Sequence, residues 1–65
     1  MVNTMQTVAA VLKKVRESRG LTYEKIYQDL RIHPRFLQAL EEGRYEVFSS
    51  PVHLKGFLKT YAEYL

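Results

Sequence analysis

Two glycines and two prolines divide this 65-residue chain into five short segments. Gly20, Pro34, Gly43 and Pro51 follow one another at intervals of 14, 9 and 8 residues. Glycine commonly occupies the left-handed position just after a helix, and proline fits the first position of a new one. Between these residues the apolar side chains recur at helical spacing, and there is no strand-like alternation. The spacing therefore predicts an all-α fold of four to five short helices.

The first two helices are expected on either side of Gly20. The spacing of apolar residues predicts an amphipathic helix over about residues 7–19. Its inner face is expected to carry Val8, Val11, Leu12 and Val15. Residues 1–6 would then form an N-terminal arm. The next helix is expected to begin at about Leu21 and Thr22, because the Thr22 hydroxyl can accept a hydrogen bond from a free amide of the first turn.

The third and final helices are each expected to begin at a proline. Pro34 predicts a helix over about residues 34–42 that ends before Gly43. A serine cap followed by Pro51 predicts the final helix over about residues 51–65. Residues 7–65 would thus form one domain. Within it, residues 22–43 have the spacing of a Cro/repressor-like helix-turn-helix, and the last helix is an addition to that unit.

The composition is typical of a small binding domain without catalytic chemistry. The chain has no cysteine, and its two histidines, His33 and His53, have no carboxylate at a ligand-like spacing beside them, so we expect no metal site. The sequence shows no nucleophile–base pair and no glycine-rich phosphate loop. We therefore expect that the chain binds no cofactor and is not an enzyme. The net charge of +3 modestly favours acidic partners, but the basic residues are scattered along the chain.

Helix-turn-helix spacing raises the question of DNA recognition. In DNA-binding members the third helix enters the major groove with its N-terminal side chains on base edges. Arg35 could then pair with guanine and Gln38 with adenine. Arg31 and Arg44 could contact phosphates on either side. Sequence-specific DNA binding through these four residues is one interpretation of the chain.

Other residues argue against that interpretation. Pro34 and Ala39 share the expected reading face but offer no side-chain hydrogen bonds. Glu41 and Glu42 would repel nearby phosphates. Tyr27 stands where such motifs usually carry a small alanine, so either its ring points outward or the two helices lie further apart. We therefore favour the interpretation that the polar residues solvate the outer face of a helix whose role is packing.

The final helix carries two apolar or aromatic stripes side by side. At about 100° per residue, the stripe expected to face the core comprises Leu54, Leu58, Tyr61 and Leu65. The neighbouring stripe comprises His53, Phe57, Thr60 and Tyr64. Lys55 and Lys59 share a third side. Gly56 lies in the middle of the helix, where glycine lowers helix stability by roughly 1 kcal/mol relative to alanine. Such a cost is tolerated where another backbone packs closely. The second stripe either packs on the aromatic connector at residues 45–48 or forms an interface, with a partner protein or with a second copy.

Three runs of the sequence carry a family resemblance: VAAVLKKVRESRGLT at 8–22, IHPRFLQALEEG at 32–43 and PVHLKGFLKTYA at 51–62. Together they resemble the cytoplasmic domain of the RodZ family of bacterial cell-shape proteins. The resemblance covers nearly the whole chain from Val8 onward. It implies a five-helix domain that binds the actin-like filament protein MreB at the cytoplasmic face of the inner membrane. In the family this contact is made largely by the final helix, through aromatic positions that His53 and Phe57 occupy here.

The resemblance leads to a working hypothesis of a non-catalytic adaptor. RodZ-like proteins continue into a linker and a membrane-spanning helix, so we expect this chain to be a cytoplasmic fragment whose link to the membrane lies beyond residue 65. We expect it to be a monomer in isolation. The side chains expected to meet the filament are His53, Phe57, Tyr64, Thr60, Lys55 and Lys59. The alternative is a DNA-binding regulator that uses Arg35, Gln38, Arg31 and Arg44.

Overall fold

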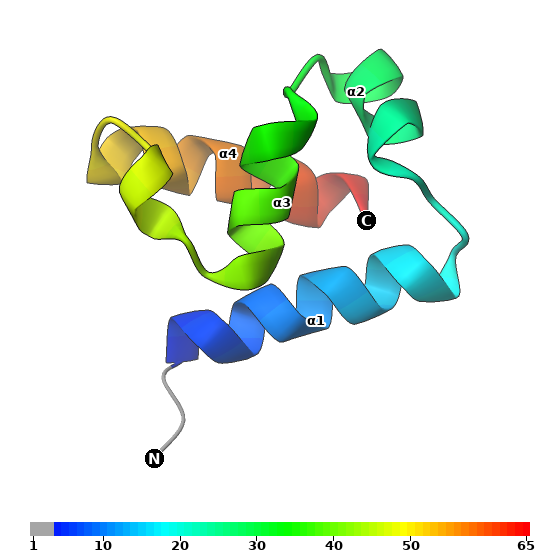
Figure 1. Cartoon of the computed structure of the whole chain (residues 1–65), viewed down its shortest axis with the longest axis horizontal. Helices are drawn as coiled ribbons and strands as arrows, with labels where there is room; N and C mark the ends of the chain where they lie inside the picture. The colour runs from blue at the N-terminus through cyan, green and yellow to red at the C-terminus, as the bar shows by residue number, and fades with distance from the viewer. Residues whose placement is uncertain (1–3) are drawn as a thin grey trace.

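The computed structural model describes residues 4–65 of the chain, with side chains from Val8 onward. Its elements are α1 (Thr4–Ser18), α2 (Tyr23–Leu30), α3 (Pro34–Glu42), the 3₁₀ helix η1 (Tyr45–Val47) and α4 (Pro51–Tyr64), as Figure 1 shows. Residues 4–65 contain no strand. The predicted all-α fold of four to five short helices is confirmed.

The helix boundaries follow the local signals of the sequence. The predicted caps of α2 and α4 are confirmed, because Thr22 Oγ1 accepts the N–H of Lys25 and Ser50 Oγ accepts the N–H of His53, each at 3.1 Å. α3 spans the predicted residues and is followed by Gly43 at a φ of 72°. This is the left-handed region, in which glycine carries no steric penalty.

The start and the inner face of α1 differ from expectation. α1 begins at Thr4, so residues 4–6 of the expected arm are helical, whereas residues 1–3 lie outside the described part. Val11 was expected in the core but is 54% exposed, and Ala9 is buried instead. The inner side of α1 is therefore centred on Ala9 and Leu12. α1 packs against α3, and a small alanine permits a close approach that a pattern of large apolar residues does not register.

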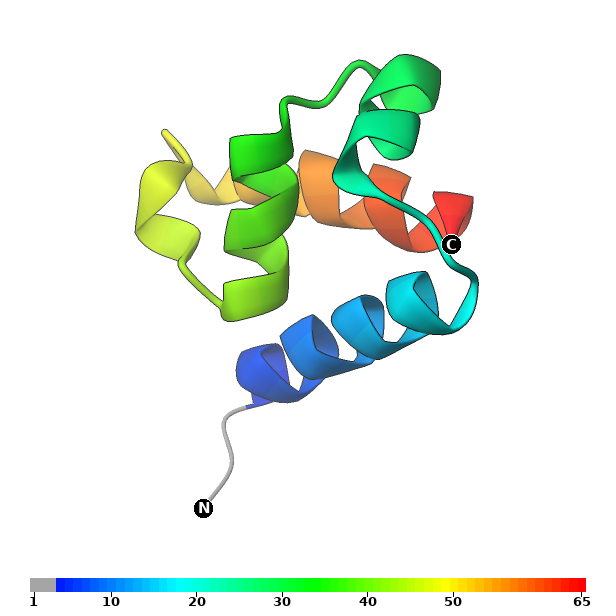
Figure 2. The same ribbon diagram turned by 45° about the vertical axis from the view of Figure 1, so that its right-hand side comes forward.

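α3 lies at the centre of the fold. In the view of Figure 1, α1 runs below it and α4 passes behind it, and the turned view of Figure 2 keeps α4 above α1. α2 leads into α3 through the short turn at residues 31–33 and forms the helix-turn-helix pair with it. The last helix is thus held against the back of the pair, with one of its sides turned away from the domain.

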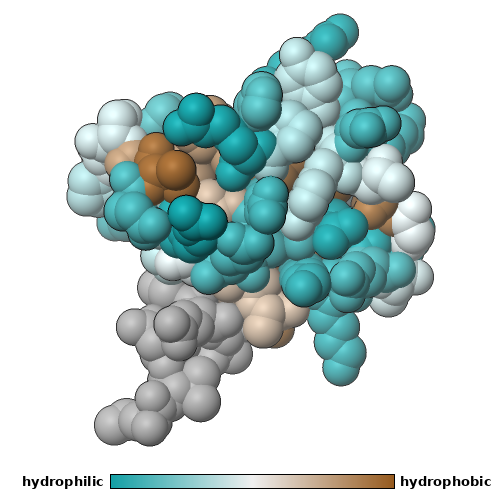
Figure 3. Space-filling view, viewed as in Figure 1, coloured by the Kyte–Doolittle hydropathy of each residue, from teal (hydrophilic) through white to brown (hydrophobic). Residues whose placement is uncertain are grey.

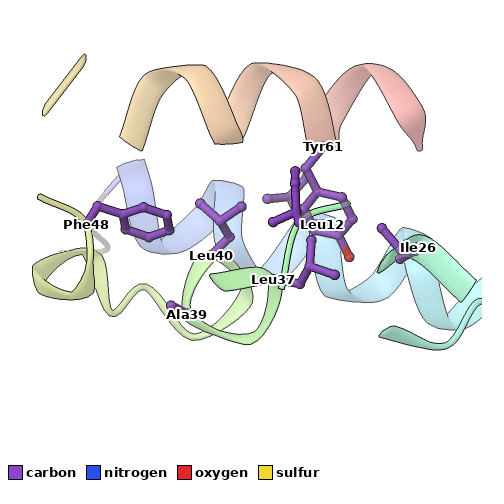
Figure 4. Close-up of a cluster of buried hydrophobic side chains, with 8 residues drawn as sticks. Leu12, Ile26, Leu37, Ala39, Leu40, Phe48 and Tyr61 are labelled. Atoms are coloured by element: carbon purple, nitrogen blue, oxygen red, sulfur yellow. The ribbon is translucent and has the colours of Figure 1, made fainter. Parts of the chain in front are cut away.

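The core is a cluster of buried side chains contributed by all four α-helices (Figure 4). Its fully buried members are Ile26, Leu37, Leu40 and Tyr61. Tyr61 confirms the predicted inner stripe of α4, and Leu54, Leu58 and Leu65 of the same stripe are partly buried against the cluster. The inner stripe thereby fixes which side of α4 remains accessible.

Candidate partner-binding site

One buried carboxylate connects all four α-helices and sets the position of α4. Glu41 of α3 has a side chain only 1% exposed. It accepts hydrogen bonds from Arg16 Nε of α1 at 2.7 Å, from the Tyr23 hydroxyl of α2 at 2.8 Å, and from the Tyr61 hydroxyl of α4. The expectation that Glu41 would repel nearby phosphates is therefore wrong, because its carboxylate is buried and bound within the domain. A buried carboxylate needs such partners, because an unpaired one would be strongly destabilising.

Arg16 is itself held by more than Glu41. Its Nη1 donates to the carbonyl oxygen of Leu21 at 2.9 Å, and its guanidinium lies 4.4 Å from the centre of the Tyr23 ring. The hydrogen bond to Glu41 raises the pKa of Arg16 above its ordinary value. No buried side-chain nitrogen or oxygen lacks a hydrogen-bond partner within the residues that the structure describes. The Glu41 network is thus a fully satisfied polar element inside an apolar core.

The tyrosines of this network make the domain sensitive to high pH. Burial, together with the hydrogen bond to Glu41, raises the pKa of Tyr23 to about 12, and burial raises the pKa of Tyr61 as well. A raised tyrosine pKa means that the folded state holds its proton more tightly than the unfolded state. The resulting stability is complete below the ordinary pKa of about 10 and is lost as the pH rises through about 12.

We therefore expect the free energy of unfolding to fall by about 1–2 kcal/mol for Tyr23 alone between pH 10 and 12. Urea denaturation across this range measures the change. Tyr23→Phe is the control, because this variant cannot ionise at that position and its pH profile should be flatter. An equally steep profile in Tyr23→Phe would contradict the assignment.

The exposed side of α4 is an open apolar surface centred on a glycine. We define the α4 face as the residues that line this shallow depression, Val52, His53, Gly56, Phe57 and Thr60. Val52 is 80% exposed, the largest exposed fraction among the large apolar residues of the part of the chain described. A Cβ added at Gly56 would meet no atom within 4 Å. Packing inside the domain therefore gives no reason for glycine at this helical position.

An aromatic cluster supports one edge of the α4 face. The Phe57 ring stacks on Phe36 of α3, with centroids 5.4 Å apart and an angle of 17° between planes. It also contacts Phe48 at 5.7 Å and His53 at 4.6 Å. His53 is exposed and its Nδ1 lies 3.0 Å from Ser49 Oγ. Phe57 is thus half-buried: one part of its ring completes the fold and the other part contributes to the surface.

The remaining residues of the predicted stripe divide between two roles. Tyr64 donates its hydroxyl hydrogen to Asp29 Oδ2 of α2 at 2.5 Å, and this bond lowers the pKa of Asp29. Tyr64 therefore ties the end of α4 to α2 and is not part of the α4 face. Thr60 lies in the face, while Lys55 and Lys59 are exposed beside it and form no ion pair within residues 8–65.

Two of the four side chains proposed to contact DNA, Gln38 and Arg44, are engaged by nearby carboxylates of the domain itself. Gln38 Nε2 donates to Glu42 Oε2 at 2.9 Å. Arg44 Nη1 lies 3.5 Å from Glu42 Oε1, and Arg44 Nε lies 3.7 Å from Glu46 Oε2. Ala39, expected on the reading face, is buried, so that expectation is wrong. The face in Figure 3, which looks onto α3, is mostly hydrophilic, as either interpretation requires.

Two arginines near the turn are held by aromatic rings rather than by carboxylates. The guanidinium of Arg31 lies 5.9 Å from the centre of the Tyr27 ring, and that of Arg35 lies 5.1 Å from the centre of the Phe36 ring. Tyr27 is 40% exposed, so of the two alternatives for this residue the structure has the outward-pointing ring. Arg31 and Arg35 remain available to an anionic partner.

Sequence reasoning missed three features of the site. The first is the Glu41 network, because nothing in the sequence near its members predicts that they contact one another. The imidazole of His33 caps α3, since its Nδ1 accepts the N–H of Arg35 at 3.1 Å. Val52 was assigned to neither stripe, although its position four residues before Gly56 places both on one side of the helix.

Comparison with known proteins yields one match. Residues 11–65 match the profile of a family described as a helix-turn-helix domain. Neither the curated proteins nor the solved structures that were compared gave a match. Within residues 4–65, no helix is long and apolar enough to cross a membrane. The same part of the chain holds no group of three or more metal-ligating side chains.

Proposed function

We propose that this chain, which belongs to the helix-turn-helix domain family, is the non-catalytic adaptor domain of a RodZ-like cell-shape protein. In this proposal the α4 face docks on the actin-like filament MreB. The domain works at the cytoplasmic face of the bacterial inner membrane and is itself monomeric. The observation that carries the proposal is an apolar face on α4 that remains uncovered by the residues that the structure describes.

The chemistry of the α4 face favours a protein partner. An exposed valine beside an uncovered glycine leaves room for a partner to approach the helix backbone closely at Gly56. Val52 and Phe57 flank this point and supply apolar area, which is the main favourable term in protein association. Aromatic side chains such as Phe57 are enriched at the centres of interfaces. A face with these properties is suited to an apolar ridge on another protein.

The charges beside the face indicate the sign of its partner. Lys55 and Lys59 are exposed and have no carboxylate partner in the part of the chain described. α4 contains one carboxylate, Glu63, in its last turn. A partner with acidic residues around an apolar centre would therefore be favoured, both in its approach and in its orientation.

DNA recognition through α3 has weaker support. Gln38 and Arg44 would have to leave the carboxylates of Glu42 and Glu46 before they could contact bases or phosphates. Those carboxylates would then lie next to the DNA backbone, where they would be repelled. Arg31 and Arg35 are the two residues of the alternative site that remain free of carboxylates among those described.

A charge placed on the α4 face tests the proposal without disturbing the fold. Val52→Glu should weaken the affinity of the domain for polymerised MreB about tenfold, or by roughly 1.4 kcal/mol. The reason is that a carboxylate would be buried against an apolar surface with an acidic border. Co-sedimentation measures this affinity. The change should not harm folding, because Val52 is 80% exposed and lies in the first turn of α4, where a carboxylate is favoured by the helix dipole.

Val11→Glu is the matched control for this measurement. Val11 is also an exposed valine, at 54%, but it belongs to the outer side of α1. This variant should sediment with the filament as the parent does. Equal binding by Val52→Glu and the parent would show that the α4 face is not the contact, and failure of the parent to sediment would remove the adaptor role altogether.

A further inference from the structure

The α4 face continues onto α3 through the aromatic cluster. Phe36 stacks on Phe57 at 5.4 Å, and it is itself only partly buried. The guanidinium of Arg35 lies 5.1 Å from the centre of the Phe36 ring. Phe36 therefore links Arg35 of α3 to Phe57 of α4, although Arg35 itself lines a separate depression with Gln38 and Glu42. Sequence reasoning had placed Arg35 in a DNA-reading position and treated the two sites separately.

The side chain of Arg35 differs from those of Arg16 and Arg44 in its ionic contacts. Arg16 and Arg44 bind the carboxylates of Glu41, Glu42 and Glu46. Arg35 is exposed and has no carboxylate partner in the part of the chain described. Its contact with the Phe36 ring holds the guanidinium next to the ring that stacks on Phe57, while its N–H groups stay open to a second group. A guanidinium held in this way binds a carboxylate in a planar, two-bonded geometry with little further loss of side-chain freedom.

We propose that Arg35 is a specificity-determining residue of the docking surface, which pairs with a carboxylate of the partner at the α3 edge of the α4 face. The proposal rests on the function proposed above and adds to it the position of an acidic residue on the partner. By the helical period, Lys55 and Lys59 lie along the edge of the α4 face that is opposite Phe57, so the apolar centre would lie between two cationic borders. The partner surface that fits is an apolar ridge with carboxylates on both flanks.

Charge reversal at two arginines separates this inference from a general effect of charge. Arg35→Glu and Arg31→Glu change the net charge by the same amount. Both parent side chains are exposed, lie over an aromatic ring and lack a carboxylate partner among the residues described. The ring under Arg31 is Tyr27, which lies outside the aromatic cluster of Phe57. The dissociation constant for polymerised MreB is measured for both variants and the parent, at low and at high salt, with circular dichroism to verify folding.

We expect Arg35→Glu to weaken binding at least fivefold at low salt, and Arg31→Glu to bind within twofold of the parent. The difference should shrink at high salt, because a partly exposed ion pair is screened. Equal weakening by both variants, or unchanged binding by Arg35→Glu, overturns the role of Arg35. If Val52→Glu still weakens binding in that case, the docking function stands without it.

The same variants test the DNA alternative. Binding of the parent to duplex DNA but not to the filament, with loss of that binding in both charge reversals, would overturn the proposed function and the role of Arg35 together. Phosphate contacts would then explain why both arginines lack carboxylates. Filament binding that only Arg35→Glu weakens supports the pairing with a carboxylate.

Discussion

Replacing Glu41 by alanine is expected to lower the free energy of unfolding by about 3 kcal/mol or more. The change removes the shared acceptor of Arg16, Tyr23 and Tyr61 and leaves a largely buried guanidinium without its carboxylate. The core of a domain this small supplies only about 3–5 kcal/mol of net stability. The Glu41→Ala variant should therefore be largely unfolded at physiological temperature. Urea denaturation followed by circular dichroism measures the loss.

The neighbouring residue provides the control for Glu41. Glu42 is exposed and its carboxylate contacts Gln38 and Arg44 on the surface. Glu42→Ala should leave the free energy of unfolding nearly unchanged. The two variants remove the same charge from adjacent positions, so a large difference between them measures the buried network. Similar stabilities for both would contradict the role of Glu41 in holding the four helices together.

Replacing Phe57 by alanine is expected to weaken filament binding by about 2 kcal/mol or more, which is a factor of roughly 30. Phe57 is the aromatic residue of the α4 face and stacks on Phe36. The truncation removes apolar contact area and also loosens the support beneath His53, whose ring lies 4.6 Å from that of Phe57. Co-sedimentation at increasing filament concentration, at a temperature at which the variant remains folded, gives the affinity.

A second change in the same cluster separates binding from folding. Phe48 contacts Phe57 at 5.7 Å but is buried, and it is not among the residues that line the α4 face. Phe48→Leu should lower stability and leave the affinity close to that of the parent. If both variants lose the same affinity, the loss at Phe57 arises through the fold and not through contact with the filament.

The secondary structure could be predicted because its signals are local. Thr22, Ser50, Pro34, Pro51 and Gly43 each act on the turn in which they lie, and the structure places each of them at the expected helix boundary. Such signals need no knowledge of the rest of the chain. The start of α1 was predicted at about Thr7, whereas the helix extends back to Thr4.

The network around Glu41 could not be predicted because it depends on tertiary contacts. Glu41 and Glu42 are adjacent and chemically alike, yet one is buried and the other exposed. The difference arises because Glu41 is hydrogen-bonded by Arg16 and Tyr61, which are 25 and 20 residues away in the sequence. The side of α1 that faces the core depends in the same way on how closely α1 and α3 approach. The pattern of residues along the sequence contains neither the distance between Glu41 and its partners nor the distance between α1 and α3.

The candidate site was predicted in part for the same reason. The helical period brought His53, Phe57 and Thr60 together, and they do lie together on α4. It also placed Tyr64 beside them, whereas the tyrosine hydroxyl is bound to Asp29 of α2. The period describes one helix and says nothing of its neighbours. The contributions of Phe36 and Arg35, which come from α3, are visible only in the folded domain.

The most direct test of the central claim is to map the contact on the domain residue by residue. The isotope-labelled domain would be titrated with non-polymerising MreB while its backbone amide resonances are followed by nuclear magnetic resonance. The account predicts that the resonances of Val52, His53, Gly56 and Thr60, and of Arg35 at the α3 edge, change most. Changes centred on Gln38 and Arg44, or no change at saturating MreB, would contradict the claim that the α4 face is the binding surface.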